Sequence, residues 1–169
     1  HRSFSTLSLK AEREDLQQNV PSSSASDPRF ATSYHAPVMW KECIDALLGC
    51  QRAQSREANN PLVFVDGTLG GGGHSQALLE ALQPGDVVFG CDVDPDALVV
   101  AEKRLDSYKG STNGPLFIPV QSNFRDLTPK LLEEKLASAL SGLGDEKSSL
   151  LQYGVQVDGL LLDLGVSSF

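Results

Sequence analysis

A glycine-rich segment is the part of this sequence with the clearest capacity for chemistry. Residues 66–75 read DGTLGGGGHS, so one acid, Asp66, precedes four consecutive glycines and a His-Ser pair follows them. Glycine permits backbone conformations and close approaches that side chains forbid, so a ligand can contact the main chain of such a loop. Because the loop stands between an apolar run and a helical pattern, it predicts a ligand at a helix N-terminus, with a flexible linker as the alternative.

A second acid, Asp92, ends the next apolar run. A carboxylate about 20 residues beyond such a loop can accept hydrogen bonds from both ribose hydroxyls of an adenosine. The alternative for Asp92 is an exposed acid in a turn. Its neighbour Asp94 is followed by Pro95, a pair that predicts a helix N-cap and first turn. The loop and Asp92 together therefore predict a ligand that contains adenosine.

Two such ligands fit this pattern, a dinucleotide and S-adenosylmethionine (SAM). SAM has no pyrophosphate to place at a helix N-terminus, but it has a cationic amino-acid end that a nearby carboxylate would attract. Asp66 stands directly before the loop. The pattern therefore favours SAM, by a small margin.

Alternating strand and helix patterns surround these residues. Short apolar runs predict buried strands at 62–65, 87–91, 117–120 and 157–162. Helical spacing predicts helices from Trp40, over 75–82, from Asp94-Pro95 and over 127–140. Pro119 predicts that the third strand is irregular or lies at an edge. Strands that alternate with helices predict an α/β fold with a doubly wound parallel sheet.

The usual strand order of such sheets places the first and fourth strands side by side, where the winding direction reverses and ligands bind. The sequence therefore predicts a cofactor-binding edge, made by the first four strands of a sheet whose remaining strands are missing. Residues 140–156 are longer and richer in Gly and Ser than a simple crossover requires, and they predict a loop insertion.

Five motifs, spread over residues 34–169, resemble the RsmH/MraW family in its order and approximate spacing. They are HAPVM at 35–39 with Glu42, DGTLGGGGHS at 66–75, CDVDP at 91–95 with Ala97, NFRDL at 123–127 and DGLLLDLGVSS at 158–168. The second and the last are highly specific. The family methylates the exocyclic N4 of a cytidine in 16S-type ribosomal RNA, so the resemblance implies a SAM-dependent rRNA (cytosine-N4-)-methyltransferase with a Rossmann-like SAM-dependent methyltransferase fold.

The resemblance also implies which residues bind the cofactor SAM. Carried over by position, these are Gly72, Gly73, His74, Asp92, Phe124 and Asp163. Phe124 would offer an apolar face to the adenine. The alternatives are core packing for Phe124, a hydrogen bond at the helix start for His74 and a purely structural role for Asp163.

Asp163 is also the candidate catalytic residue. The target amine is a poor nucleophile because its lone pair is delocalised, so an acceptor for its proton should help an in-line attack on the methyl group. Two further hypotheses stay open. One is a SAM methyltransferase that acts on another substrate, such as DNA or a small molecule, and the other is a truncated, non-catalytic SAM-binding module.

The resemblance covers only an N-terminal portion of the family. Residues 34–169 are interpreted as the N-terminal part of the SAM-binding domain. The family's inserted helical domain is missing, as is the Gln that follows the double serine and contacts the cofactor.

Charge weighs against an RNA partner within these residues. The net charge is −8, and residues 61–169 hold seven basic and fifteen acidic residues. Binding to small-subunit rRNA, the partner that the resemblance implies, normally takes a surface of Lys and Arg. Either such a surface lies outside these residues or the RNA interpretation is wrong.

Residues 1–33 have no sustained apolar periodicity and predict a disordered segment. Their first ten residues are basic, hydroxylated and free of acids, as in the transit peptides of organelles. With an enzyme of bacterial type, this opening indicates a plant-like organellar homologue, with the plastid as the first expectation and the mitochondrion as the second. An ordinary mobile N-terminus is the alternative.

Other features indicate a soluble domain without a metal. No apolar run approaches the roughly 20 residues that span a bilayer. Cys43, Cys50 and Cys91 lack the spacing of a zinc site, and we expect them to be small buried hydrophobes in a reducing compartment.

Overall fold

The computed structural model describes residues 38–49, 60–111, 113–141 and 154–164. The predicted disordered segment at 1–33, most of the predicted insertion at 140–156 and Cys50 lie outside these residues. The start of the first motif, at 35–37, and the end of the last motif, at 165–168, also lie outside them.

The described residues form an α/β unit in which every paired strand is parallel to its neighbour. In chain order the elements are α1 (Trp40–Leu48), β1 (Val63–Asp66), α3 (Gly73–Ala81), β2 (Val87–Asp92), α4 (Pro95–Arg104), η1 (Asp106–Tyr108), β3 (Leu116–Gln121), η2 (Phe124–Asp126), α5 (Pro129–Leu140) and β4 (Gly159–Leu161). The strand order is β3-β2-β1-β4, so β1 lies beside β4 as predicted. The Rossmann-like fold class is therefore confirmed.

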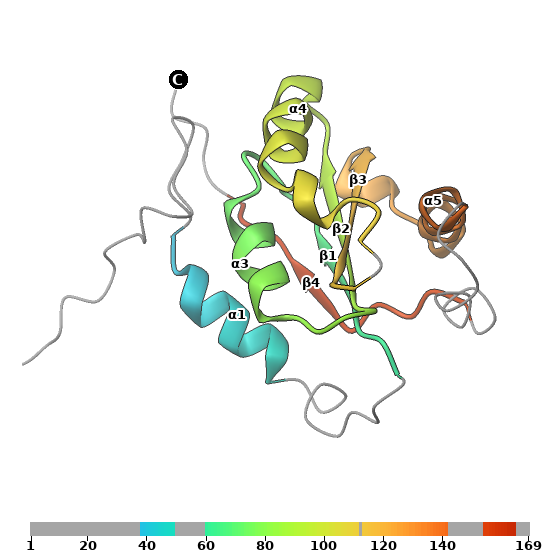
Figure 1. Cartoon of the computed structure of the whole chain (residues 1–169). Coiled ribbons are helices and arrows are strands. Elements are labelled where there is room, and N and C mark those ends of the chain that lie inside the picture. The colour runs from blue at the N-terminus through green and yellow to red at the C-terminus, as the bar shows by residue number, and fades with distance from the viewer. Residues whose placement is uncertain (1–37, 50–59, 112, 142–153, 165–169) are drawn as a thin grey trace, which may run out of the picture.

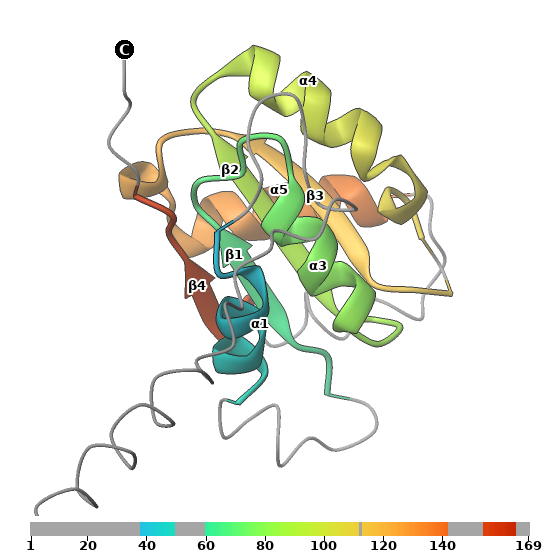
Figure 2. The same ribbon diagram turned by 90° about the vertical axis from the view of Figure 1, so that its left-hand side faces the viewer.

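Helices cover both faces of this sheet. Figure 1 shows α1, α3 and α4 on one side and α5 on the other, and Figure 2 looks onto the three-helix side with α5 behind the strands. Successive strand residues pack on opposite faces of the sheet. Phe64 and Val88 lie in one core, and Val65 and Phe89 lie in the other. No helix among the described residues is long and apolar enough to span a membrane.

Two strands bear on the predictions. β3 is an edge strand of the described sheet, as Pro119 indicated. β4 is shorter than the predicted 157–162, and a side chain takes part in the pairing at its start. The carboxylate of Asp158 accepts the hydrogen bond of the Val63 amide at 2.8 Å, where a strand would use a carbonyl.

Local side-chain caps set the helix starts. Asp94 caps α4 as predicted, since its Oδ1 accepts from the Asp96 amide at 2.9 Å. Thr128 caps α5 by accepting from the Leu131 amide at 3.2 Å, so this helix begins at Pro129 and not at the predicted residue 127. Each cap satisfies an amide that the helix itself leaves unpaired.

Candidate functional site

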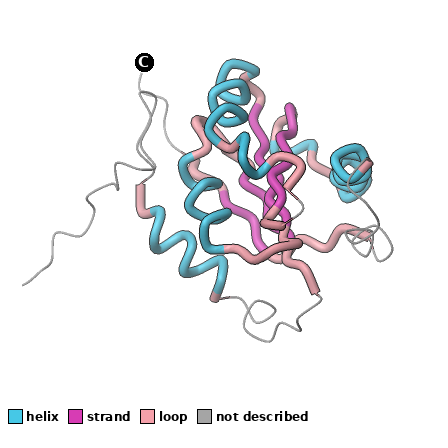
Figure 3. Tube along the Cα trace, viewed as in Figure 1, coloured by secondary structure: helices cyan, strands magenta, loops and turns pink. Residues whose placement is uncertain are grey.

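The predicted site residues gather at the carboxyl ends of the strands, which form the upper edge of the sheet in Figure 1. The segment from Asp66 to Gly73 leaves β1 there and enters α3, and we call it the glycine loop. It runs past the ends of β2 and β4, the neighbours of β1. The tube in Figure 3 shows the same loops above the strands. The sheet thus brings together residues that are far apart in sequence.

Asp66 closes the glycine loop from within. Its side chain is completely buried, its Oδ1 accepts from the Thr68 amide at 3.1 Å, and its Oδ2 accepts from the Ser75 hydroxyl at 2.8 Å. Burial raises the pKa of this carboxyl above its ordinary value, although both hydrogen bonds oppose that shift. The sequence interpretation gave Asp66 a direct attraction for a cationic ligand. The structure instead turns the carboxylate inward, where it braces the loop.

Two glycines of the loop have left-handed backbones and different surroundings. Gly72, with φ of 77°, is buried, and a Cβ there would lie 3.2 Å from the Cβ of Ala101 on α4. Its small size therefore lets the loop pack against α4. Gly70, with φ of 49°, is open, because a Cβ there would meet no atom closer than 4.0 Å. The backbone at Gly70 is thus accessible to a ligand, while the predicted binding residue Gly73 begins α3 half-buried.

Asp92 joins the end of β2 to the glycine loop. Its Oδ2 accepts from the Gly70 amide at 2.8 Å, and its Oδ1 accepts from the Asp94 amide at 2.9 Å. The side chain is half-buried. A carboxylate has about four lone-pair sites, so two remain for hydroxyl donors. Asp92 can therefore brace the loop and still accept hydrogen bonds from a ribose.

Phe124 lies across the start of the glycine loop. A Cβ at Gly67 would come within 3.0 Å of the Phe124 Cβ and within 2.5 Å of the Leu162 side chain. Gly67, which sequence analysis did not single out, is therefore the residue that lets Phe124 approach β1. The Phe124 side chain is 37% exposed, unlike a core phenylalanine. Its ring thus retains accessible apolar surface.

His74 makes a tertiary contact and not a local one. The buried ring places Nε2 3.1 Å from the carbonyl oxygen of Val38, just before α1. Because a carbonyl can only accept, Nε2 donates this hydrogen bond. The alternative prediction was a hydrogen bond at the start of α3, but Nε2 bonds to a residue outside that helix. His74 ties α3 to the segment that enters α1.

Asp163 follows β4 and is exposed. Its backbone amide donates to Oγ1 of Thr68 at 2.7 Å, which connects the end of β4 to the glycine loop. Sequence analysis missed Thr68. The available signal was a hydroxyl residue within a loop of glycines, because Thr side chains readily bond to nearby backbone groups.

The two described cysteines lie close to this edge. Cys91 in β2 is fully buried, its thiol donates to the Ser122 carbonyl at 3.0 Å, and burial raises its pKa to about 11. Cys43 in α1 is half-buried, and its pKa is also raised, by burial first and by the charge of Asp163 second. The prediction of a small buried hydrophobe is confirmed for Cys91 and holds in part for Cys43.

These residues fit an adenosyl ligand that carries positive charge. Asp92 keeps acceptors for hydroxyl groups, Gly70 leaves open space beside the backbone, and Phe124 presents apolar surface. The exposed acid Asp163 favours a cation at the same edge. Within the described ranges, no group of three His, Cys, Asp or Glu side chains could hold a metal ion.

Comparison with known proteins indicates the family of this chain. The model of the MraW methylase family matches residues 32–169. The ribosomal RNA small subunit methyltransferase H of Chlorobium luteolum is 38% identical over 148 residues, which cover 83% of this chain and 36% of that protein. The protein of the same name from Syntrophus aciditrophicus is 38% identical over 141 residues, covering 83% of this chain and 35% of its own.

A third relative of that name, from Mycobacteroides abscessus, is 37% identical over 145 residues, which cover 86% of this chain and 31% of its own. The chain thus spans about a third of the length of these curated relatives. A solved structure from Clostridium thermocellum, 14% identical with a TM-score of 0.39 over 59% of this chain and 60% of its own, is too distant to bear on function. On the family match and these identities, the chain belongs to the MraW methylase family.

Proposed function

We propose that this chain is the N-terminal, SAM-binding part of an enzyme that methylates N4 of a cytidine in small-subunit ribosomal RNA. The observation that carries the proposal is the meeting of the glycine loop, Asp92 and Asp163 at one edge of the sheet, through hydrogen bonds of 2.8 Å and 2.7 Å. Membership of the family and the names of the relatives support the same reaction.

Each side chain has a separate task in binding the cofactor. Asp92 accepts hydrogen bonds from the ribose hydroxyls, as its free lone pairs allow. Phe124 packs its exposed face against the adenine. Gly72, Gly73 and His74 shape the loop and the start of α3 beside the ligand. When bound, SAM supplies an electrophilic methyl group on a cationic sulfur.

Asp163 acts on the nucleic-acid side. Its exposed carboxylate accepts a proton from the target amine, whose delocalised lone pair makes it a poor nucleophile. A base within a folded RNA must leave its stack to reach this edge. The protein then contributes mainly by holding the amine in line with the methyl group and the proton acceptor beside the amine.

Binding of the RNA phosphates requires positive charge, and the described residues at this edge provide little of it. Arg125, beside Phe124, is exposed, as is Lys130 in the first turn of α5. Acids outnumber them at the same edge, where Asp94, Asp96 and Asp126 are exposed too. We therefore propose that most phosphate contacts come from parts of the protein outside these 169 residues.

Calorimetry with SAM tests the cofactor proposal. Asp92→Asn removes the charge and one acceptor, so we expect the dissociation constant to rise about tenfold, as for one lost charged hydrogen bond. Asp94→Asn is the matched control, because Asn also caps helices well and the affinity should stay unchanged. Tighter binding of a nicotinamide dinucleotide than of SAM would overturn the proposal.

Methyl transfer to small-subunit rRNA tests the reaction. We expect SAM to bind both to this chain and to a form that spans the full length of the relatives, and methyl transfer only from the longer form. Transfer to DNA or to a small molecule in place of rRNA would favour another substrate. Binding without transfer by either form would favour a cofactor-binding module.

We also propose that the enzyme works in an organelle with bacterial-type ribosomes. The plastid is the first candidate and the mitochondrion is the second. The acid-free, hydroxylated composition of residues 1–10 supports this, as do relatives that come from bacteria. A fluorescent fusion should accumulate in plastids, and a cytosolic signal would contradict the proposal.

A further inference from the structure

Thr68 stands at the centre of the hydrogen bonds that join the glycine loop to β4. Its Oγ1 accepts from the backbone amide of Asp163 at 2.7 Å, across 95 residues of sequence. This is at the short end of the range for an amide donor, about 2.7–3.2 Å. The bond therefore fixes the backbone of Asp163 directly to the loop.

Regular strand pairing does not reach Asp163. β4 pairs with β1 as far as Leu161, which lies opposite Asp66, and the Gly67 amide still donates to the Leu161 carbonyl at 2.9 Å. Beyond that point the chain leaves the sheet. Within the described ranges, the bond to Thr68 is the only hydrogen bond that Asp163 makes. The hydroxyl of Thr68 thus decides where this part of the chain sits.

Thr68 is itself held from the inside of the protein. Its amide donates to Asp66 at 3.1 Å, and the same carboxylate accepts from Ser75 on α3 at 2.8 Å. Asp66 and Ser75 are both completely buried. A continuous chain of hydrogen bonds therefore runs from α3 through Asp66 and Thr68 to Asp163, and its inner members are buried.

We propose that Thr68 is a positioning residue for methyl transfer, whose hydroxyl sets the place of Asp163 relative to the glycine loop. The inference rests on the proposed function, because it couples the acceptor of the amine proton to the loop that holds the methyl donor. Displacing a reacting group by about 1 Å can slow catalysis roughly 100-fold. A single hydroxyl at this junction therefore controls turnover more than it controls cofactor affinity.

Steady-state kinetics of a full-length enzyme with SAM and small-subunit rRNA test this role. Thr68→Val keeps the shape and removes the acceptor, so kcat should fall at least about tenfold while KM for SAM stays within about twofold. Thr68→Ser keeps the hydroxyl and should restore kcat to within about threefold of the original enzyme. The matched control is Thr128→Val, which removes the same kind of bond, 3.2 Å to the Leu131 amide, away from the site and should leave kcat unchanged.

Three kinetic results would overturn the inference. An unchanged kcat in Thr68→Val would show that the bond does not matter for turnover. Equal losses in Thr68→Ser and Thr68→Val would assign the effect to packing of the methyl group. A rise in KM for SAM that matches the fall in kcat would make Thr68 a part of the cofactor loop alone.

Hydrogen exchange at the Asp163 amide provides a readout that does not depend on the reaction. In NMR spectra of the same proteins, Thr68→Val should speed exchange at Asp163 at least about tenfold and leave the Gly67 amide protected. Equal protection of Asp163 in both proteins would overturn the positioning role, whatever the enzyme methylates. Faster exchange in a protein that never methylates rRNA would contradict the proposed function and keep the positioning bond.

Discussion

The two edges of the sheet each contain a completely buried aspartate, and the two residues serve different ends. Asp86, at the amino edge, accepts from the backbone amides of Leu62 and Gln83, both at 2.8 Å. Asp66, at the carboxyl edge, accepts from the Thr68 amide and the Ser75 hydroxyl. The first fixes the starts of strands. The second fixes a loop on which other functional residues depend.

Burial of an acid therefore does not identify the functional edge. At the carboxyl edge, by contrast, Asp92 is half-buried and Asp163 is exposed, while hydrogen bonds hold the glycine loop between them. At the amino edge, Asp158 uses its carboxylate on the Val63 amide and so completes the sheet. A rigid loop that carries accessible carboxylates suits ligand binding, whereas carboxylates whose hydrogen bonds are all made within the protein suit stability.

The largest effect is expected at the amino edge. Asp86→Ala should lower the free energy of unfolding by about 3 kcal/mol, because it leaves the buried Leu62 amide and the partly buried Gln83 amide without their acceptor, and a buried amide without a partner costs about 1–3 kcal/mol. Urea unfolding measures this loss, and SAM affinity of the folded protein should not change. A loss below about 1 kcal/mol, or weakened SAM binding, would contradict a purely structural role for the amino edge.

At the carboxyl edge, the largest effect should appear in turnover and not in stability. Asp163→Asn in a full-length enzyme should lower kcat about 100-fold, equivalent to about 2.7 kcal/mol, because a general base contributes at least that much. The side chain is exposed, so the free energy of unfolding should change by less than about 0.5 kcal/mol. Unchanged turnover would remove Asp163 from the mechanism.

A pH series separates the role of Asp66 from that of an ordinary surface acid. Burial raises the pKa of the folded Asp66 carboxyl above the ordinary 3.8, so the unfolded chain ionises first as the pH rises. The folded state then binds more protons than the unfolded state. The contribution of Asp66 to stability is therefore full below about pH 3.8 and declines as the pH rises through the raised pKa.

Asp66→Asn cannot ionise and should escape this decline. The free energy of unfolding of the original protein, minus that of Asp66→Asn, should fall between pH 3 and pH 7 when both are measured in urea. Other acids cancel in this difference because both proteins contain them. A difference that rises with pH would mean that the Thr68 and Ser75 donors outweigh the cost of burial.

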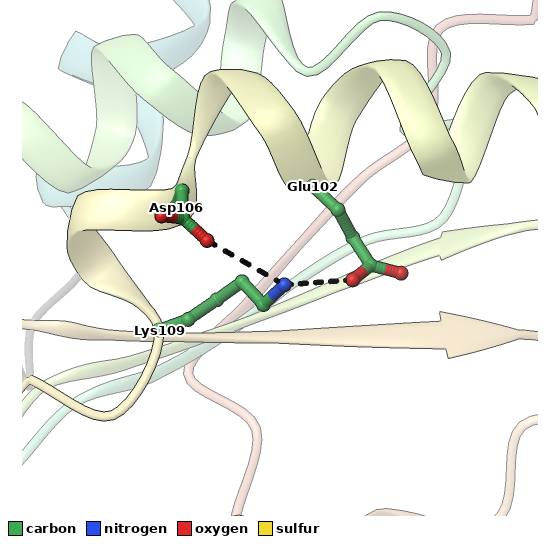
Figure 4. A network of polar contacts seen from close by, with 3 residues as sticks. All are labelled: Glu102, Asp106 and Lys109. Carbon is green, nitrogen blue, oxygen red and sulfur yellow. Dashed lines mark hydrogen bonds and ion pairs between the residues drawn. The ribbon is translucent and has the colours of Figure 1, made fainter.

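The smallest effect is expected beyond the end of α4, towards the amino edge. Lys109 lies 2.8 Å from Glu102 and 3.8 Å from Asp106, a network that Figure 4 shows from close by. Lys109 and Glu102 are each 37% exposed, so solvent and salt screen the pairs. Lys109→Met should change the free energy of unfolding by less than about 0.5 kcal/mol. A loss above about 1 kcal/mol in urea unfolding would contradict this weak role.

Local sequence patterns were sufficient to predict the architecture, one helix cap and one edge strand. Alternating strand and helix patterns predicted a parallel sheet, and the usual strand order of such sheets predicted that β1 pairs with β4; the structure confirms both. Asp94 was predicted as an N-cap and Pro119 as an edge residue, and both predictions are confirmed. Helix caps and the periodicity of a strand or helix depend on neighbours within a few residues, so a linear pattern contains them. The motifs indicated the family in the same way, and the family match confirms it.

The contacts among the site residues became visible in the folded structure. The contact of His74 with Val38 spans 36 residues, and that of Asp163 with Thr68 spans 95. Ala101 on another helix occupies the space beside Gly72, where a Cβ would come within 3.2 Å of it. Such contacts follow from the order and register of strands that are remote in the chain. A local pattern cannot specify them, because it records what each segment prefers and not which segment comes to lie against it.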